Sequence, residues 1–279
     1  MTSLARVHAP LRVERPASAL AKVMKYEVSD IVRSRWLIAY TLFFVVIADG
    51  LQRFSGDTPN ALMSLMNVVL VIIPLVNIVF GTMYLHATRE FTELLLAQPV
   101  GRGRLFGGLY LGLALPLSLA YVAGVAVPFV LHGIDEPAYR TTLLVLLAVG
   151  VVLTFAFTGL AFIIALRFED KVKGFGVAIG CWLFAAVLYD GIVLLAASMF
   201  ANYPLERVLV VVMLLNPVDL ARVLLLLQLD VSALMGYTGA VFKSFFGSTG
   251  GIALTVAALA AWMALPSIYA LRLFRRKDF

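Results

Sequence analysis

Six apolar stretches dominate the amino-acid sequence, and each is close to the length that a helix needs to cross a bilayer. The hydrocarbon core of a bilayer is about 30 Å thick and a helix rises about 1.5 Å per residue, so about 20 apolar residues span it. The stretches cover residues 36–51, 62–85, 105–131, 141–166, 175–199 and 250–271. This pattern predicts an all-α membrane protein with six transmembrane helices.

The overall composition excludes a soluble enzyme. Of the 279 residues, 62% are hydrophobic and 14% are charged, whereas a soluble domain has about half apolar and about a quarter charged residues. The polar surface that such a domain needs is missing, so lipid must replace water around most of the chain. A single cysteine, Cys181, excludes a disulfide framework and a cysteine-rich metal site.

The Lys and Arg residues lie at the ends of the apolar stretches, and their distribution predicts the orientation of the chain. Seventeen of the 22 lie before the first stretch, after the last, or in the second and fourth connections. The other five are Arg53, Arg140, Arg207, Arg222 and Lys243. Because cytoplasmic loops are enriched in Lys and Arg, both termini are expected in the cytoplasm. The net charge of +6 forms no basic stripe, so no nucleic acid partner is expected.

The chain is predicted to consist of a short N-terminal segment and one transmembrane domain. The N-terminal segment is residues 1–35. In its second half, residues 18–35, apolar side chains recur at three- and four-residue spacing. This spacing is typical of an amphipathic helix that lies on the membrane surface, and a solvated cytoplasmic helix is the alternative. Residues 36–279 form the transmembrane domain.

An outer segment, residues 201–249, contains a long apolar run that polar and helix-breaking residues interrupt. These residues are Asn216, Pro217, Asp219 and Arg222. A central Asp or Arg costs about 2.5–3.5 kcal/mol on insertion scales, so this run is not expected to span the membrane. Instead, one helix should end near Leu215 and another should begin at Asn216, a good N-cap that is followed by proline. The segment, with Asp230, is predicted to be a bent, half-inserted and partly helical structure on the outer side.

Neither a catalytic site nor a bound cofactor is expected in this chain. The sequence contains no G-x-x-x-x-G-K-[ST] loop for nucleotide phosphates. Its three His residues are scattered, and none has a second metal ligand at suitable spacing in its own segment. Methionines in the outer half leave a Cu(I) path open as an alternative to ordinary apolar packing.

Two carboxylates, Asp49 and Asp190, lie within the apolar stretches. An ionisable residue inside a membrane is costly and indicates a functional site by default. Asp49 is close to the outer end of its stretch, where interfacial water can reach it. Asp190 lies deeper, and no Lys, Arg or His lies within a stretch to pair with it. A proton-coupled carrier is therefore disfavoured, and a carboxylate hydrogen-bonded across a helix or subunit contact is an equal alternative for Asp190.

The connection between the second and third stretches reads REFTELLLAQPVGRGRLFGG over residues 89–108. It resembles the ABC-2 (type V exporter-like) class of ABC-transporter permeases, in which an acidic stretch, Glu-Leu-Leu-Leu, proline and a basic turn join these two spans. The matching residues are Arg89, Glu90, Glu93, Leu94, Leu95, Leu96, Pro99 and Arg102. The sequence departs from the family pattern at Phe91, where glycine is usual, and at Gly108, where lysine is usual.

The resemblance implies that this connection docks on a separate cytoplasmic ATPase, which binds the ATP and Mg. The three leucines Leu94, Leu95 and Leu96 are expected to face the membrane. Arg89, Glu90 and Glu93 are expected to face the cytosol. Such an amphipathic connector suits docking into a partner's groove, and a simple interfacial linker is the alternative. The fourth connection offers a second contact through Glu169, Asp170 and Lys171.

The outer segment, with its Leu-Asn-Pro-Val-Asp sequence from Leu215, is similar to ABC-2 permeases that assist assembly of the copper centre of nitrous oxide reductase. This resemblance implies a homodimer in a bacterial inner membrane that works with an ATPase, a periplasmic protein and, through that protein, a copper chaperone. Two alternatives stay open. One is an ABC-2 exporter for another small solute, a lipid or a drug, and the other is a scaffold or ion-coupled carrier without an ATPase.

Overall fold

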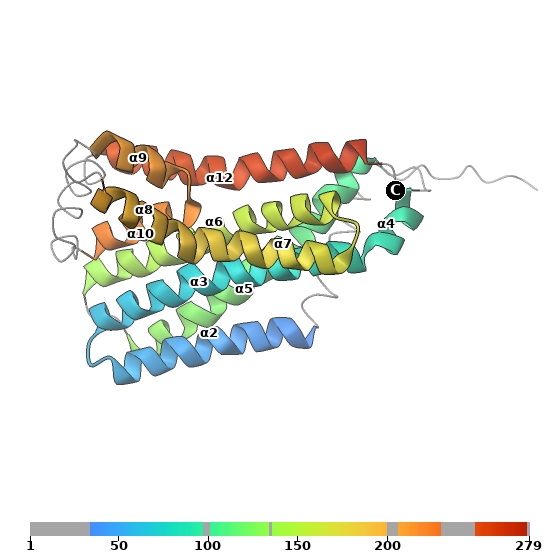
Figure 1. Ribbon diagram of the computed structural model, residues 1–279. Coiled ribbons are helices and arrows are strands. Elements are labelled where there is room, and N and C mark those ends of the chain that lie inside the picture. The colour runs from blue at the N-terminus through green and yellow to red at the C-terminus, as the bar shows by residue number, and fades with distance from the viewer. Residues whose placement is uncertain (1–33, 97–100, 134–135, 200–205, 230–248, 278–279) are drawn as a thin grey trace, which may run out of the picture.

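The computed structural model describes residues 34–96, 101–133, 136–199, 206–229 and 249–277, and these residues form helices joined by short connections (Figure 1). The helices are α2 (Arg35–Phe54), α3 (Thr58–Ala87), α4 (Arg89–Leu96), α5 (Arg102–His132), α6 (Pro137–Arg167), α7 (Lys171–Leu183), the π-helix η1 (Phe184–Leu188), α8 (Tyr189–Met199), α9 (Glu206–Leu214), α10 (Pro217–Gln228) and α12 (Thr249–Arg276). The amphipathic helix predicted over 18–35 lies almost wholly outside the described residues, as do Pro99 and Asp230.

Six helices are long and apolar enough to cross a membrane, which confirms the predicted fold class. They are Arg35–Phe54, Thr58–Ala87, Arg102–His132, Pro137–Arg167, Lys171–Ala196 and Gly250–Arg276. The fifth of them, called the fifth span below, is continuous through α7, η1 and the first part of α8. Each predicted stretch coincides with one of these helices to within a few residues at most boundaries.

The core of the bundle consists of α3, α5 and α6, and small residues bring these helices close together. A Cβ on Gly81 of α3 would lie 2.7 Å from the Cβ of Ala161 in α6, and one on Gly150 of α6 would lie 2.3 Å from the ring of Tyr121 in α5. Such close approach strengthens van der Waals packing, which replaces the hydrophobic effect between helices in lipid. Around this core, α2 packs on α5, α7 packs on α3, and α12 packs on α6.

The two ends of the bundle carry different elements (Figure 1). Helix α4 and the described C-terminal end of the chain lie at one end, and α8, α9 and α10 lie at the other. We call these the α4 end and the α10 end. The start of α2, the connection between α6 and α7 and the described end of α12 all lie at the α4 end (Figure 1).

The outer segment breaks where the sequence predicts a break. Helix α9 ends at Leu214, and α10 begins at Pro217 with Asn216 as its N-cap, whose side chain accepts a hydrogen bond from Val218 N at 3.0 Å. Helix α10 is inserted into the bundle, because its first eight residues, except Arg222, are largely buried against α3, α6 and α12. The apolar side chains of its first turns explain this docking.

Candidate functional site

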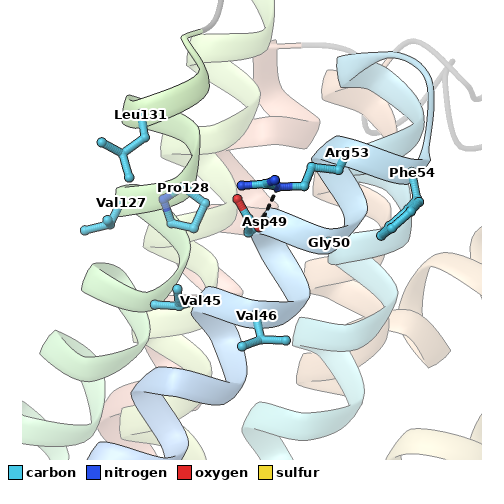
Figure 2. A pocket seen from close by; sticks show the side chains of 9 residues that line it. All are labelled: Val45, Val46, Asp49, Gly50, Arg53, Phe54, Val127, Pro128 and Leu131. Atoms are coloured by element: carbon cyan, nitrogen blue, oxygen red, sulfur yellow. Dashed lines mark ion pairs between the residues drawn. The ribbon is translucent and has the colours of Figure 1, made fainter.

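Asp49 lies near the end of α2 that is at the α10 end of the bundle, and it is paired within its own helix (Figure 2). Its Oδ2 atom is 2.8 Å from Arg53 Nε, and its Oδ1 atom faces His132 Nε2 of α5 at 3.5 Å. The Asp49 side chain is 34% exposed, and its contact with interfacial water stays a prediction. The sequence pointed to Asp49 but not to His132, because their contact joins two separate helices.

Asp190 has a basic partner, and the expectation that it lacks one is wrong. Arg222 Nη1 of α10 donates a hydrogen bond to Asp190 Oδ2, and the same nitrogen lies 3.7 Å from Asp219 Oδ1. Arg222 was counted with the outer loops, but the docking of α10 against the bundle brings its guanidinium to the fifth span. We call these three residues the outer ion cluster.

Two hydrogen bonds between the outer segment and the fifth span lie next to this cluster. Asn216 Nδ2 donates to Ala185 O at 2.7 Å, and Tyr189 Oη donates to Val212 O at 2.6 Å. Ala185 belongs to η1, and π-helical turns inside α-helices are frequent at functional sites. The break between α9 and α10 is thus fastened to the fifth span by one ion pair and two hydrogen bonds.

Asp219 is the most buried member of the outer ion cluster. It is 4% exposed, and its Oδ1 atom forms no hydrogen bond within the described part of the chain. Burial, followed by the neighbouring carboxylate of Asp190, raises the pKa of Asp219 to about 8, although Arg222 and Asn216 oppose this rise. At neutral pH, Asp219 is therefore mainly protonated, and Arg222 balances the charge of Asp190.

This protonation predicts that stability falls as the pH rises. The folded chain keeps a proton on Asp219 that the unfolded chain releases near its ordinary pKa of 3.8. Stability is therefore lost between that value and about 8, and no further loss from this group follows above it. We expect a lower thermal midpoint at pH 8.5 than at pH 6 for purified protein in detergent, and a smaller difference for Asp219→Asn. Equal pH dependence in both proteins would contradict the assignment.

At the opposite end of the bundle, α4 presents a mixed face of acidic and apolar side chains. Glu90, Phe91 and Leu94 are exposed, the latter two at 46% and 70%, whereas Leu95 and Leu96 pack partly against the core. Residues 90 and 91 lie four and three positions before residue 94, so both are on the same side of the helix as Leu94. We call them the α4 face. Leu94 therefore lies with the acidic side of α4 rather than with the other leucines.

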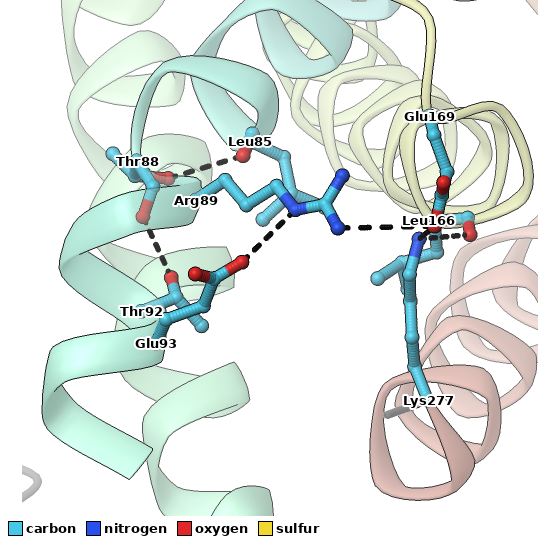
Figure 3. Close-up of polar contacts among 8 residues, drawn as sticks. All are labelled: Leu85, Thr88, Arg89, Thr92, Glu93, Leu166, Glu169 and Lys277. Carbon is cyan, nitrogen blue, oxygen red and sulfur yellow. Dashed lines mark hydrogen bonds and ion pairs between the residues drawn. The ribbon is translucent and has the colours of Figure 1, made fainter. Parts of the chain in front are cut away.

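A chain of polar contacts joins α4 to two other elements at the same end (Figure 3). Arg89 Nε is 3.1 Å from Glu93 Oε1, and Arg89 Nη2 is 3.8 Å from Glu169 Oε1. Lys277 Nζ lies 3.8 Å from the same Glu169 oxygen and donates a hydrogen bond to Leu166 O at 2.8 Å. Glu169 thus links α4, the α6–α7 connection and the end of α12. Burial and the charge of Arg89 lower the pKa of Lys277, against the effect of Glu169.

The remaining predicted residues of this end have structural roles of their own. Asp170 is the N-cap of α7, accepting a hydrogen bond from Val172 N at 2.8 Å, and Lys171 is exposed directly after it. Arg102 Nη1 donates to the carbonyls of Arg275 and Lys277 at 2.8 and 2.9 Å. Arg275 and Lys277 were not singled out in the sequence, where the C-terminal cations served only to predict orientation.

The structure has six candidate spans, with the exposed α4 face at one end and the outer ion cluster at the other. These features define a multi-pass membrane protein of the transporter class. The chain belongs to the ABC-2 family of transporter proteins, whose family model matches residues 21–279. It is an ABC transporter permease, the membrane subunit of such a system, and a permease of this family implies an ABC ATPase partner.

Two curated relatives match most of the chain. Both are named "Probable ABC transporter permease protein NosY". The protein from Pseudomonas aeruginosa is 27% identical over 259 residues, which cover 87% of this chain and 90% of that protein. The protein from Stutzerimonas stutzeri is 24% identical over 274 residues, which cover 91% of this chain and 97% of that protein.

Proposed function

We propose that this permease transmits movement from a NosF-like cytoplasmic ATPase to a NosD-like periplasmic protein during assembly of the copper centre of nitrous oxide reductase. The similarity to NosY-named permeases over nearly the whole chain supports this role. In the proposal, two copies of the chain form a homodimer in a bacterial inner membrane, with both termini and the α4 end in the cytoplasm. ATP and Mg bind to the ATPase, and a copper chaperone works through the periplasmic protein.

The observation that carries the proposal is that the fifth span joins two sets of contacts: it begins directly after the connection that contacts α4, and it contains a member of the outer ion cluster. Its first residue, Lys171, follows Glu169 and the N-cap Asp170, and Glu169 contacts Arg89 next to the α4 face. The same helix contains Asp190, the fifth-span member of the outer ion cluster. A displacement of α4 by a bound ATPase can therefore reach α10 through one helix and two sets of polar contacts.

At the cytoplasmic end, the α4 face is the proposed ATPase contact, with Glu169, Asp170 and Lys171 beside it. An ATPase that closes on ATP would push α4, and the Arg89–Glu169–Lys277 contacts would pass this force to α7 and α12. At the outer end, Asn216, Pro217, Asp219, Arg222 and Asp230 form the proposed outer gate, which acts on the periplasmic protein. Switching such an element from 1:99 to 99:1 requires about 5.5 kcal/mol of differential stabilisation.

Deletion of this chain tests the proposal through the copper content of nitrous oxide reductase. We expect the reductase from a deletion strain to lack its catalytic copper centre and its activity, and we expect the wild-type chain to restore both. Copper analysis and the absorption spectrum of the purified enzyme measure this outcome. A reductase that keeps its copper in the deletion strain would contradict the proposal and would favour an ABC-2 exporter for another solute, lipid or drug.

A further inference from the structure

A hollow of about 470 Å³ lies between α2 and α5, toward the α10 end of the bundle (Figure 2). Asp49 and Arg53 lie at one end of it, and valine and leucine side chains form its walls. None of its lining residues belongs to the outer ion cluster or the α4 face. The hollow is therefore separate from the contacts that carry the proposed function.

Two glycines show where α2 and α5 touch and where they separate. Deeper in the bundle, α2 and α5 touch, since a Cβ on Gly124 would lie 2.7 Å from the Cβ of Phe44. Farther along α2, Gly50 lines the hollow, and a Cβ on it would meet no atom within 4 Å. The hollow thus lies beyond the close contact at Gly124, with open space beside Gly50.

The polar end of the hollow offers both signs of charge to a ligand. The side chain of Arg53 is 62% exposed and that of Asp49 is 34% exposed. Arg53 contacts Asp49 through Nε, which leaves its terminal nitrogens, with four N–H donors, uncontacted by the described residues. Asp49 also faces His132 Nε2 at 3.5 Å, and its carboxylate, with about four lone-pair sites, can accept a further hydrogen bond besides these two contacts.

The walls of the hollow suit an acyl chain. Val46 on α2 and Val127 and Leu131 on α5 are exposed, and all three belong to candidate membrane spans. Val46 lies about 10 Å below Arg53 along the helix axis at 1.5 Å per residue. A molecule that contacts both positions must therefore combine a charged group with a hydrocarbon chain.

We propose that this hollow binds one phospholipid with an ethanolamine headgroup. The phosphate accepts hydrogen bonds from Arg53, the ammonium donates to Asp49, and an acyl chain packs against Val46, Val127 and Leu131. Charge complementarity selects this headgroup. Phosphatidylglycerol brings no cation for Asp49, and the quaternary ammonium of phosphatidylcholine has no N–H to donate.

Lipid titration of the purified, delipidated chain in detergent, followed by native mass spectrometry, tests the proposal. We expect phosphatidylethanolamine to bind about tenfold more tightly than phosphatidylglycerol or phosphatidylcholine, as one additional charge-assisted hydrogen bond permits. Asp49→Asn should remove this preference. Gly50→Leu should fill the hollow and weaken binding of all three lipids. Gly176→Leu, at an exposed glycine of α7 with no atom within 4 Å of a Cβ, is the matched control and should bind as the wild type does.

Soluble phosphoethanolamine separates a headgroup site from a lipid site, and it should not bind at concentrations that saturate the lipid. Equal affinity for the three lipids would overturn the proposal, as would an unchanged preference in Asp49→Asn or undiminished binding in Gly50→Leu. Binding of phosphoethanolamine alone would overturn the acyl-chain contact. Thermal midpoints of the variants, measured in parallel, show that each one is folded.

Discussion

Replacing Arg222 with methionine is expected to destabilise the outer segment by about 3 kcal/mol, because removal of one partner from a buried ion pair leaves the other charge uncompensated. Asp190 would keep its carboxylate at the fifth span, with Asp219 close to it and without an ion pair to any other described residue. The side chains of Arg222 and Asp190 are 26% and 32% exposed, so the low end of the usual range applies. The thermal midpoint of the purified protein and protease susceptibility near residue 215 measure the effect.

The double variant Asp190→Asn with Arg222→Met is the matched control. Because Asp219 is mainly protonated at neutral pH, removal of both remaining charges leaves a neutral cluster, and most of the lost stability should return. Such recovery is the signature of a direct pair, since independent sites would add their losses. If the double variant is as unstable as the sum of the two single variants, the ion pair does not fasten α10 to the fifth span. Maturation of the reductase, assayed in the same strains, should fall and recover in parallel.

The six spans and the break at Asn216 could be predicted because both depend on short stretches of sequence. The length of an apolar run and the charges within it decide whether a helix can cross a bilayer. Asn216 and Pro217 satisfy the local requirements of a helix start, and the Asn216 side chain caps α10 as expected. Neither inference requires knowledge of which helices are neighbours.

The polar contacts between elements could not be predicted from local patterns. Arg222 and Asp190 are 32 positions apart, and Lys277 and Leu166 are 111 positions apart. Counting Arg222 with the outer loops gave it no partner in the fifth span, whereas the apolar first turns of α10 pack into the bundle and carry the guanidinium with them. A pair of opposite charges, one in a span and one in an interrupted apolar run, is the signal that could have indicated this contact.

The position of Leu94 shows the same limit at the scale of one helix. Three consecutive leucines cannot share one face, since successive side chains on a helix point about 100° apart. The packing of α4 on the bundle decides which of them is covered, and Leu95 and Leu96 pack against the core while Leu94 does not. A single large apolar side chain is thereby left beside Glu90 and Phe91, on the face proposed to meet the ATPase.

Replacing Leu94 with glutamate is expected to abolish stable association with the ATPase. A large apolar side chain at the centre of an interface contributes at least about 2 kcal/mol when it is a hot spot, or about 30-fold in affinity, and a buried charge adds to this loss. Because Leu94 is 70% exposed in the chain alone, the fold should be unaffected. Co-purification of a tagged ATPase from membranes that hold both proteins measures association, and the thermal midpoint of the permease measures folding.

Phe54→Glu is the matched control, because it introduces the same charge at a residue that is 90% exposed at the outer end of α2. It should leave ATPase association at the wild-type level. Reversing both acids of α4, Glu90→Lys with Glu93→Lys, separates the contributions of charge and apolar contact. Loss of association in this double variant as well would mean that an electropositive surface of the ATPase receives α4. Normal association in Leu94→Glu and in the double variant would exclude α4 as the coupling contact, and the α6–α7 connection would then have to transmit the movement alone.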